Sequence, residues 1–252
     1  MDTDRFADRL ADAVRARTAV APLTEELDLT VDDAYAIQDA VIERLGGRST
    51  VAKLGLTSRA KQEQMNVAEP IYGWFVDGSA TDIGQPLQVD RFIQPRAEPE
   101  IAFLTAEPLS GPGVTAAHVL TATAAVLPAL DILDSRYAGY RFTLPDVAAD
   151  NASAASFCVG DPIPVAGIDL RLTGCVFERN GELVATAAGA AVLEHPAAAV
   201  AWFVRKLHAR GQTLPAGSLV LAGALTAAIP ITTGDVVRVT LDRLGSVELS
   251  CR

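Results

Sequence analysis

The sequence predicts an α+β protein in which helices come first and a largely antiparallel β core follows. Residues 4–17 and 31–45 carry apolar side chains at helical spacing. From Thr50 onward, short strand-like runs alternate with Gly and Pro, and no repeat or low-complexity linker interrupts them. We therefore expect a single domain over residues 1–252, with a helical N-terminal portion at 1–48 and a β core at 49–252.

The helices are predicted from their apolar faces and from the residues that start and stop them. In 4–17 the face includes Phe6, Leu10 and Val14, and the helix over 31–45 begins after Thr30 and ends at Gly46-Gly47. Two peripheral helices are expected at 116–125 and 197–210. Pro196 and Gly211 suit the two ends of the second of these.

The β core is predicted from runs rich in Val, Leu, Ile and Thr. These runs lie at 50–56, 101–104, 126–132, 170–179, 184–193, 218–222, 236–241 and 247–251. Asn180-Gly181 lies between two of them, which is typical of a β-hairpin turn.

The composition of the chain argues against nucleic acid and membrane as partners. The chain has 252 residues, 50% of them hydrophobic, and a formal net charge of −10, which argues against binding to nucleic acid. Its apolar stretches are too short to span a bilayer, and its charged first residues do not resemble a secretory signal, so we expect no membrane partner. Cys158, Cys175 and Cys251 have no metal-like spacing, which favours reduced thiols in a cytoplasmic protein.

The segment Arg96-Ala-Glu-Pro-Glu-Ile-Ala-Phe103 carries the clearest sign of chemistry. Glu98 and Glu100 are one residue apart at the start of a strand-like run, so their side chains should leave the strand on the same face. Two carboxylates on one face repel each other unless a positive group lies between them. A divalent metal ion is the simplest such group.

A third acidic candidate is Asp131, which lies between Leu130 and Ile132 in an apolar run. A carboxylate there is costly to bury without compensation. Three oxygen ligands without imidazole or thiolate favour Mg²⁺ or Mn²⁺ over zinc. The alternative is a set of solvated charges at strand ends, paired with Arg96 or Arg136.

Two more ionisable residues are candidates. Lys53 stands in the apolar run Val51-Ala-Lys-Leu-Gly-Leu-Thr57, so its ammonium either needs an anion or reaches the surface. Asp77 follows an aromatic-rich run and precedes Gly78, so it is either an acid near a site or a simple turn residue. The three histidines do not form a hydrolytic set, and no nucleophile elbow or phosphate-binding loop is present.

Several motifs in order resemble the 2-keto-4-pentenoate hydratase / 4-oxalocrotonate decarboxylase family, within the fumarylacetoacetate hydrolase superfamily. The resemblance runs from about Asp33 to the C-terminus. It rests on Lys53-Leu-Gly-Leu-Thr-Ser58, Glu69-Pro-Ile-Tyr-Gly73, the segment 96–103, Pro128–Tyr137, Asp150-Asn-Ala-Ser153, Gly189–Pro196, Pro215-Ala-Gly-Ser218 and Gly245-Ser-Val247.

The resemblance implies a β-roll core with peripheral helices, and Mg²⁺ or Mn²⁺ as cofactor. Glu98 and Glu100 stand at the family's E-x-E ligand positions, and Asp131 stands where the family usually has a third Glu. Lys53 and Asp77 match catalytic positions. The pocket is expected to be lined by Leu54, Gly55, Leu56, Phe75, Asn151 and Ser153.

The resemblance also implies the reaction. We expect metal-dependent decarboxylation of 2-oxohex-3-enedioate (4-oxalocrotonate), or an analogue, to 2-hydroxypenta-2,4-dienoate through a metal-stabilised dienolate. Ile71 favours this reading, because the family's hydratases usually carry Asp there, and so do Asp134-Ser-Arg-Tyr137 and the segment 223–228. The alternative is a 2-hydroxypenta-2,4-dienoate hydratase, in which Asp77 or Lys53 would handle protons.

Partners follow from the same resemblance. They are a small unsaturated 2-oxo acid, further copies of this chain in a homo-oligomer, and a paralogous hydratase or decarboxylase. Two departures from the family pattern leave a second alternative, a non-catalytic scaffold for an active paralogue. Asp131 is one methylene shorter than the usual Glu, and Pro99 removes a strand N–H between the two ligands, which predicts a sheet edge or a bulge.

Overall fold

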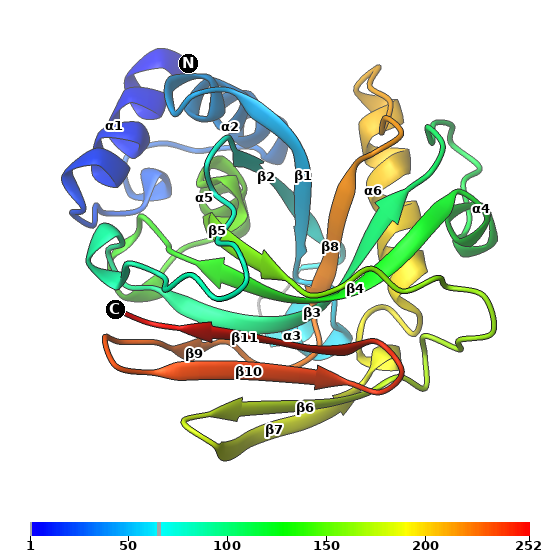
Figure 1. Cartoon of the computed structure of the whole chain (residues 1–252). Coiled ribbons are helices and arrows are strands. Elements are labelled where there is room, and N and C mark those ends of the chain that lie inside the picture. The colour runs from blue at the N-terminus through cyan, green and yellow to red at the C-terminus, as the bar shows by residue number, and fades with distance from the viewer. Residues whose placement is uncertain (1, 65–66) are drawn as a thin grey trace.

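A computed structural model describes residues 2–64 and 67–252 and contains two packed β-sheets with helices around them (Figure 1). The larger sheet has seven strands in the order β2-β1-β8-β3-β4-β5, with the short strand β9 also paired to β3. The bounds are β1 Arg48–Gly55, β2 Ile71–Val76, β3 Arg96–Thr105, β4 Thr123–Leu133, β5 Ala154–Val159, β8 Leu219–Ala224 and β9 Ile229–Pro230.

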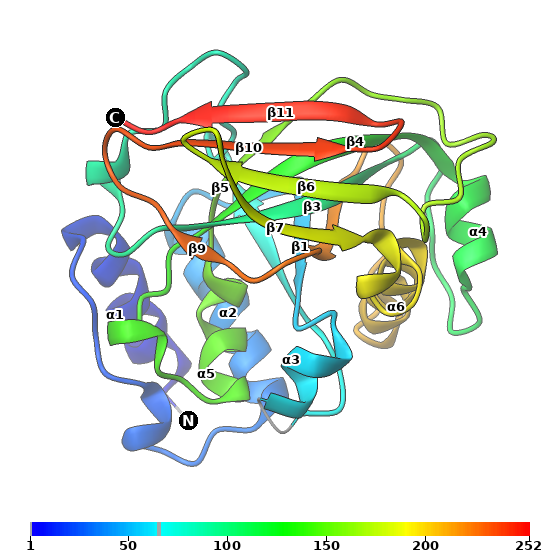
Figure 2. The ribbon, with the colours of Figure 1, turned by 90° about the horizontal axis from the view of Figure 1, so that it is seen from below.

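The smaller sheet has four strands in the order β11-β10-β6-β7. Their bounds are β6 Gly174–Arg179, β7 Glu182–Ala188, β10 Val236–Leu241 and β11 Gly245–Ser250. It packs through β10 and β11 against β4, so the two sheets lie face to face (Figure 2). Every strand pair except β1–β8 is antiparallel, which confirms the predicted α+β fold with a largely antiparallel core.

The helices lie at the periphery of the sheets (Figure 2). Their bounds are α1 Thr3–Ala16, α2 Val31–Arg44, α3 Arg59–Gln64, α4 Ala116–Thr121, α5 Leu144–Ala149 and α6 Pro196–Ala209. Helix α2 starts at a capping box, in which Thr30 and Asp33 bond each other's backbone N–H groups. Helices α1 and α2 pack on each other and α6 packs on β8, so apolar faces are covered at both ends of the curled sheet. Within the described residues, no helix is long and apolar enough to cross a membrane.

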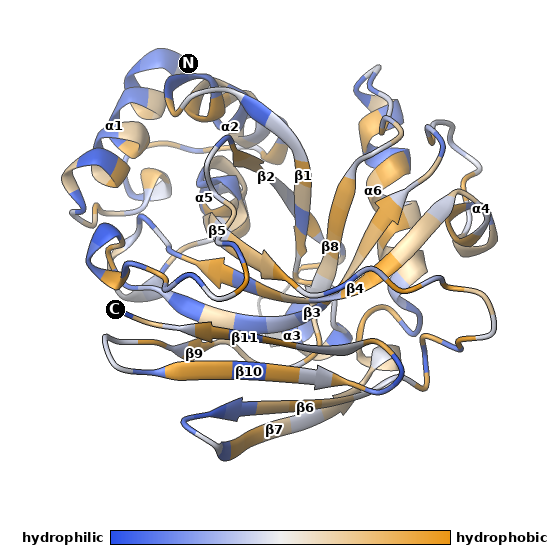
Figure 3. Ribbon diagram, in the orientation of Figure 1, coloured by the Kyte–Doolittle hydropathy of each residue, from blue (hydrophilic) through white to orange (hydrophobic). Residues whose placement is uncertain are grey.

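Hydrophobic side chains fill the space between the sheets and beneath the helices, whereas β3 carries hydrophilic residues near its start (Figure 3). That contrast marks a strand with two buried carboxylates. Glu98 and Glu100 are both buried there.

The curled sheet nearly closes on itself, because β2 and β5 are its two outer strands and the segment that follows β2 bonds to β5. The Thr81 N–H donates to the Phe157 carbonyl at 2.8 Å, and the Phe157 N–H donates to the Ser79 carbonyl at 3.2 Å. The inside of the curl is therefore a space lined by alternate residues of several strands.

The structure differs from the predicted elements at several places. The helix predicted at 116–125 ends at Thr121, because residues from Thr123 onward pair with β3 as part of β4. The run 170–179 becomes a strand only from Gly174, and the run 184–193 is a strand only to Ala188. Strands β2 and β5 were not predicted, since their side chains are buried without simple alternation.

Candidate metal centre

The curled sheet brings three carboxylates together on its inner face. Glu98 and Glu100 are alternate residues of β3, and Asp131 on β4 is the direct register partner of Glu98. One carboxylate oxygen of each lies within 4.8 Å of the others, and all three residues are buried. Like charges placed directly opposite each other across two strands are destabilising unless a cation compensates them.

Three of the carboxylate oxygens lack a hydrogen-bond donor among the residues that the structure describes. Glu100 Oε2 accepts from the Gly223 N–H at 2.6 Å, but Glu100 Oε1 and both Asp131 oxygens have no hydrogen-bond partner there. Burial, and then the neighbouring Asp131, raise the pKa of Glu100 well above its usual value. Burial also raises the pKa of Asp131, although Lys53 opposes the shift.

Lys53 on β1 supplies a buried positive charge next to the carboxylates. Its Nζ lies 2.8 Å from Asp131 Oδ2 and donates to the Ala152 carbonyl at 3.1 Å. Burial favours a lower pKa for Lys53, but Asp131, Glu98 and Glu100 outweigh burial and raise it. Lys53 is therefore a protonated ammonium held against the cluster, and it does not snorkel to the surface.

A second lysine, which the sequence analysis missed, reaches the same cluster from helix α3. Lys61 Nζ lies 2.7 Å from Glu98 Oε1, and the Ser58 hydroxyl, 3.2 Å from the Lys61 backbone N–H, fixes the start of that helix. The side chain of Lys61 is 32% exposed, whereas that of Lys53 is 3% exposed. The cluster is thus deepest at Lys53 and shallowest at Lys61.

The residues present suit a hard divalent cation. Three carboxyl groups meet two ammonium groups in a buried space, and the raised pKa of Glu100 shows that full ionisation of the three needs more positive charge than the two lysines supply. Oxygen ligands alone select Mg²⁺ or Mn²⁺ over softer metals, and the three buried oxygens that lack a hydrogen-bond donor provide lone pairs. The shorter Asp131 side chain still reaches the cluster, because its strand position lies directly opposite Glu98.

The alternative of arginine-paired surface charges does not fit the described residues. Arg136 forms a buried ion pair with Asp150, and the guanidinium carbon of Arg96 lies 4.0 Å from the ring centroid of Tyr140. Neither arginine forms an ion pair with Glu98, Glu100 or Asp131 within that part of the chain.

Comparison with known proteins places this geometry in a family. Residues 42–251 match the family described as fumarylacetoacetate (FAA) hydrolase C-terminal. The chain belongs to the fumarylacetoacetate hydrolase family. Among its relatives, a 4-oxalocrotonate decarboxylase of Pseudomonas sp. (strain CF600) is 44% identical over 87% of this chain and 85% of that protein. A 2-keto-4-pentenoate hydratase of Paraburkholderia xenovorans (strain LB400) is 38% identical over 97% of this chain and 93% of that protein.

A solved structure agrees with the sequence relatives. The 4-oxalocrotonate decarboxylase from Pseudomonas putida G7, complexed with magnesium and adipate, superposes with a TM-score of 0.95 and 36% identity. The match covers 99% of this chain and 97% of that one. The suspected family resemblance is therefore confirmed.

In this member of the fumarylacetoacetate hydrolase family, Pro99 lies in a central strand and not in an edge strand. Strand β3 is central, with β4 on one side and β8 and β9 on the other. The Pro99 carbonyl accepts from the Leu225 N–H at 2.9 Å, between the stretches where β8 and β9 pair with β3. The pairing with β8 shifts register between Glu100 and Ala102, so the missing N–H falls where the ladder is already interrupted.

The residues expected to line the pocket divide between two faces of the sheet. Phe75 shares the face of Lys53, because Lys53 pairs with Gly73, and it packs on Phe157 with ring centroids 4.6 Å apart. Gly55 and Leu56 lie at the end of β1, where Leu56 has a φ of 55° and packs beside Ile71 and its neighbours. Leu54 belongs to the main core on the opposite face and is fully buried.

Asn151 and Ser153 hold the turn that presents the Ala152 carbonyl to Lys53. The Asn151 amide accepts from the Trp74 N–H at 2.8 Å and donates to the Trp74 carbonyl at 2.7 Å, as a neighbouring strand would. The Ser153 hydroxyl donates to Asp150 at 3.2 Å. Residues 151–153 have φ between 51° and 57°, a strained run that these contacts maintain.

Replacing Asn151 with alanine is expected to lower the free energy of unfolding by about 2–4 kcal/mol, because the buried N–H and carbonyl of Trp74 would both lose their partner. Chemical denaturation measures this change. The same truncation at the exposed Gln88 should change the free energy of unfolding by less than about 0.5 kcal/mol. Equal effects at the two positions would contradict the role given to Asn151.

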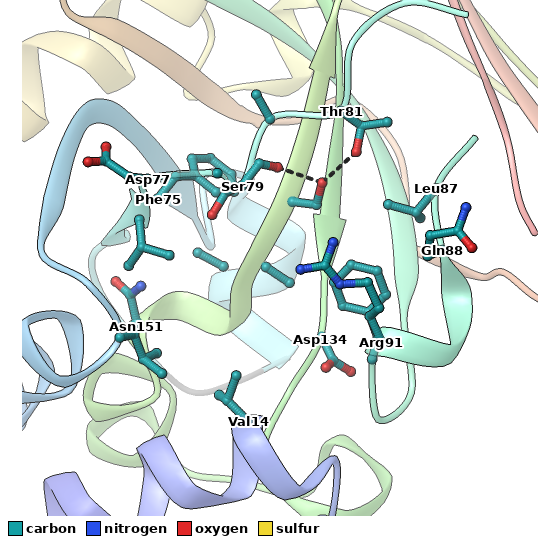
Figure 4. A pocket seen from close by; sticks show the side chains of 18 of the residues that line it. Val14, Phe75, Asp77, Ser79, Thr81, Leu87, Gln88, Arg91, Asp134 and Asn151 are labelled. Atoms are coloured by element: carbon teal, nitrogen blue, oxygen red, sulfur yellow. Dashed lines mark hydrogen bonds between the residues drawn. The ribbon is translucent and has the colours of Figure 1, made fainter. Parts of the chain in front are cut away.

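The structure does not bring Asp77 to the carboxylates. It follows the end of β2, its side chain is exposed, and it lines a separate cavity of about 490 Å³ together with Asn151, Arg91 and Asp134 (Figure 4). Glu98, Glu100, Asp131 and Lys53 do not line that cavity. We place the reactive site at the buried charges and not at this cavity. The cluster combines carboxylate oxygens that can bind a cation with a protonated lysine, and these residues do not line the cavity.

Proposed function

We propose that this chain catalyses the divalent-metal-dependent decarboxylation of 2-oxohex-3-enedioate, or a close analogue, to 2-hydroxypenta-2,4-dienoate. The observation that carries the proposal is the buried cluster of Glu98, Glu100 and Asp131 with two lysines against it. Support comes from the 44% identity to a 4-oxalocrotonate decarboxylase and from the structural match to one complexed with magnesium and adipate. Adipate is a saturated six-carbon dicarboxylate, the same length as the proposed substrate.

In this reaction the bond between C5 and C6 breaks, and C6 leaves as CO₂. The electron pair forms a C4–C5 double bond, the C3–C4 double bond moves to C2–C3, and the C2 oxygen becomes an enolate. Mg²⁺ or Mn²⁺ held by Glu98, Glu100 and Asp131 would supply Lewis acidity for that oxygen. Proton transfer to the product oxygen completes the dienol.

Lys53 is the proposed proton carrier and fixed positive charge. Its ammonium is buried, and three carboxylates keep it protonated. The Ala152 carbonyl accepts from its ammonium and Asp131 Oδ2 lies 2.8 Å away as its ion-pair partner, which leaves N–H groups that can reach the substrate. A preoriented charge in a water-poor space stabilises a developing enolate more strongly than a solvated one.

Apolar side chains surround this charged centre on the inner face of the sheet. One group comprises Phe75, Ala102, Leu127, Ala129, Phe157 and Leu221, and another comprises Ile71, Val147 and Ala152. They leave few groups that could solvate the departing carboxylate. Poor solvation of a carboxylate favours its loss as neutral CO₂.

Hydration of 2-hydroxypenta-2,4-dienoate is the second candidate, because a relative at 38% identity is a hydratase. Ile71, where the family's hydratases usually carry Asp, argues against it: the side chain is 3% exposed and packs with Val147 and Ala152. No carboxylate is therefore contributed from this position of β2.

Substituting Ile71 with aspartate is expected to lower kcat/KM for decarboxylation at least about tenfold more than substituting it with asparagine, which has the same shape as aspartate but no charge. Both changes place a polar group in the apolar wall, but only aspartate repels the remote carboxylate of the substrate. Steady-state kinetics of the two variants at saturating Mg²⁺ give the comparison. Equal losses would show that packing, and not charge, matters at this position.

The proposal is tested by incubating the purified chain and Mg²⁺ with each of the two substrates in turn. Release of CO₂ with formation of the dienol supports the decarboxylase. Formation of a 4-hydroxy-2-oxo acid from the dienoate supports the hydratase. If neither product forms while Mg²⁺ binds, the reaction assigned to the site is wrong.

We further propose a cytoplasmic location and assembly with other chains, either as a homo-oligomer or with a paralogous hydratase or decarboxylase. The first rests on composition and the second on the family resemblance. Light scattering of the purified chain, alone and mixed with a co-expressed paralogue, tests the assembly. A monomer under both conditions would exclude both assemblies.

A further inference from the structure

The two lysines at the carboxylate cluster differ in depth and in how many partners they have. Lys53 is nearly inaccessible and bonds both Asp131 and a backbone carbonyl. Lys61 is one-third exposed, and among the described residues its ammonium pairs with Glu98 alone, at 2.7 Å. Glu98 is itself the shallowest of the three carboxylates, with 5% exposure against 0% for Glu100 and Asp131. Lys61 therefore stands where the cluster opens toward solvent.

Lys61 and a divalent cation would compete for the same carboxylate. The Glu98 oxygen that faces the Lys61 ammonium belongs to one of the three residues whose oxygens converge. Two cations close together repel each other, so a filled site favours displacement of the mobile ammonium. Lys61 extends from a helix of six residues on a long flexible side chain, which allows that displacement without unfolding.

Other basic groups near the opening already have partners. Arg59 lies 3.8 Å from Glu194, with both side chains more than four-fifths exposed. Arg136 is buried against Asp150, and Arg96 stacks on Tyr140. Lys53 and Lys61 each pair with a carboxylate that would also hold the metal, and of these two Lys61 is the exposed one.

We propose that Lys61 binds the remote carboxylate of the substrate and so makes the site select dicarboxylates over monocarboxylates. The inference rests on the proposed function and deepens it. A dianionic substrate whose keto acid end lies at the carboxylate cluster has a second carboxylate that needs a cation nearer to solvent. Lys61 is a flexible primary ammonium, which suits a single charge-assisted contact to a carboxylate.

The chemistry predicts how this contact acts on the kinetics. The remote carboxylate loses its charge as CO₂ forms, so an ammonium bound to it stabilises the ground state at least as well as the transition state. Such a contact lowers KM and does not raise kcat. Lys61 is therefore a residue for binding and selection, in contrast to Lys53.

Isothermal titration calorimetry with Mg²⁺ present tests the proposal by comparing adipate with the five-carbon monocarboxylate 2-oxopentanoate. Substituting Lys61 with methionine is expected to weaken adipate binding about 10- to 100-fold and 2-oxopentanoate binding less than about twofold. Lys61→Arg should recover much of the adipate affinity. KM for the diacid should rise in Lys61→Met while kcat stays within about threefold.

Lys206→Met is the matched control, because Lys206 pairs with Glu69 at 2.6 Å and has 37% exposure, close to the 2.7 Å and 32% of Lys61. It should leave both affinities unchanged. Unchanged adipate affinity in Lys61→Met, or equal loss for both ligands, would overturn the proposal. Because calorimetry needs no turnover, that result is distinct from failure of the decarboxylation assay with the unmodified protein, which would overturn the proposed function.

Discussion

Substituting Glu100 with glutamine is expected to abolish decarboxylation and, at the same time, to make the metal-free protein more stable. Glu100 is fully buried, one of its oxygens has no donor among the described residues, and Asp131 lies beside it. A glutamine can keep the bond from the Gly223 N–H and turn its amide N–H toward Asp131. Burial raises the pKa of Glu100, so ionising this residue in the metal-free protein is costly, and a neutral amide that avoids this cost should raise the free energy of unfolding by about 1–3 kcal/mol.

Thermal unfolding with and without Mg²⁺ separates the two effects of this substitution. Mg²⁺ should raise Tm for the unmodified protein, since an ion that binds only the folded state stabilises it, but not for Glu100→Gln. Glu182→Gln makes the same chemical change on exposed strand β7 and should alter neither Tm nor the response to Mg²⁺. A Glu100→Gln protein that is less stable without metal and still gains stability from Mg²⁺ would contradict the metal centre described above.

Substituting Lys53 with methionine is expected to lower kcat/KM by about 10²–10⁴-fold, the usual range for a group that transfers a proton. It should also lower the free energy of unfolding of the metal-free protein by about 3–5 kcal/mol, because Asp131 would keep a buried charge without its partner. Methionine retains most of the side-chain volume, so packing changes little.

The double variant Lys53→Met/Asp131→Asn tells charge from packing. It should regain much of the lost stability, because neither side chain is then charged, but it should not regain activity. Urea denaturation without divalent metal and steady-state kinetics with Mg²⁺ supply the two measurements. If the double variant is as unstable as Lys53→Met, the ion pair with Asp131 is not what Lys53 contributes to folding. Lys61→Met offers a comparison, since a part-exposed lysine should have a much smaller effect on stability.

The carboxylate cluster was predictable because it depends on strand geometry. The spacing of Glu98 and Glu100 places them on one face wherever the segment is extended, and an Asp in an apolar run needs compensation. The register that sets Asp131 opposite Glu98 is a tertiary fact, and the family resemblance implied only that Asp131 joins the two glutamates. Lys53 was predicted in the same way, first as a lysine in an apolar run and then from the family resemblance.

Lys61 could not be found in this way. It lies on a short helix whose sequence is polar and gives no burial signal, and its contact with Glu98 joins residues 37 positions apart. The Gly223 N–H is equally hidden, although a glycine with φ of 111° packed on Thr57 is a position where a side chain would clash. Both contacts depend on how the sheet curls, which no local pattern encodes.

Asn151 and Asp77 show that a motif can single out a residue without showing what its side chain contacts. Each lies near residues that the motifs singled out, but the structure gives the Asn151 amide to the backbone of Trp74 and leaves Asp77 exposed beyond the end of β2. The contact between the segment after β2 and strand β5 arises because the curled sheet closes, and neither β2 nor β5 was predicted. A role for Asp77 in proton transfer remains a prediction that its position does not support.

The most direct test of the account measures CO₂ release and metal occupancy together. Metal-stripped protein would be titrated with Mn²⁺ in the presence of 2-oxohex-3-enedioate labelled with ¹³C at C6, and bound ion and labelled CO₂ would be followed at each step. We expect one ion per chain, labelled CO₂ in proportion to occupancy, and neither binding nor release in Glu100→Gln. Full CO₂ release by the stripped protein, or unchanged ion binding by Glu100→Gln, would contradict the claim that Glu98, Glu100 and Asp131 hold the metal on which decarboxylation depends.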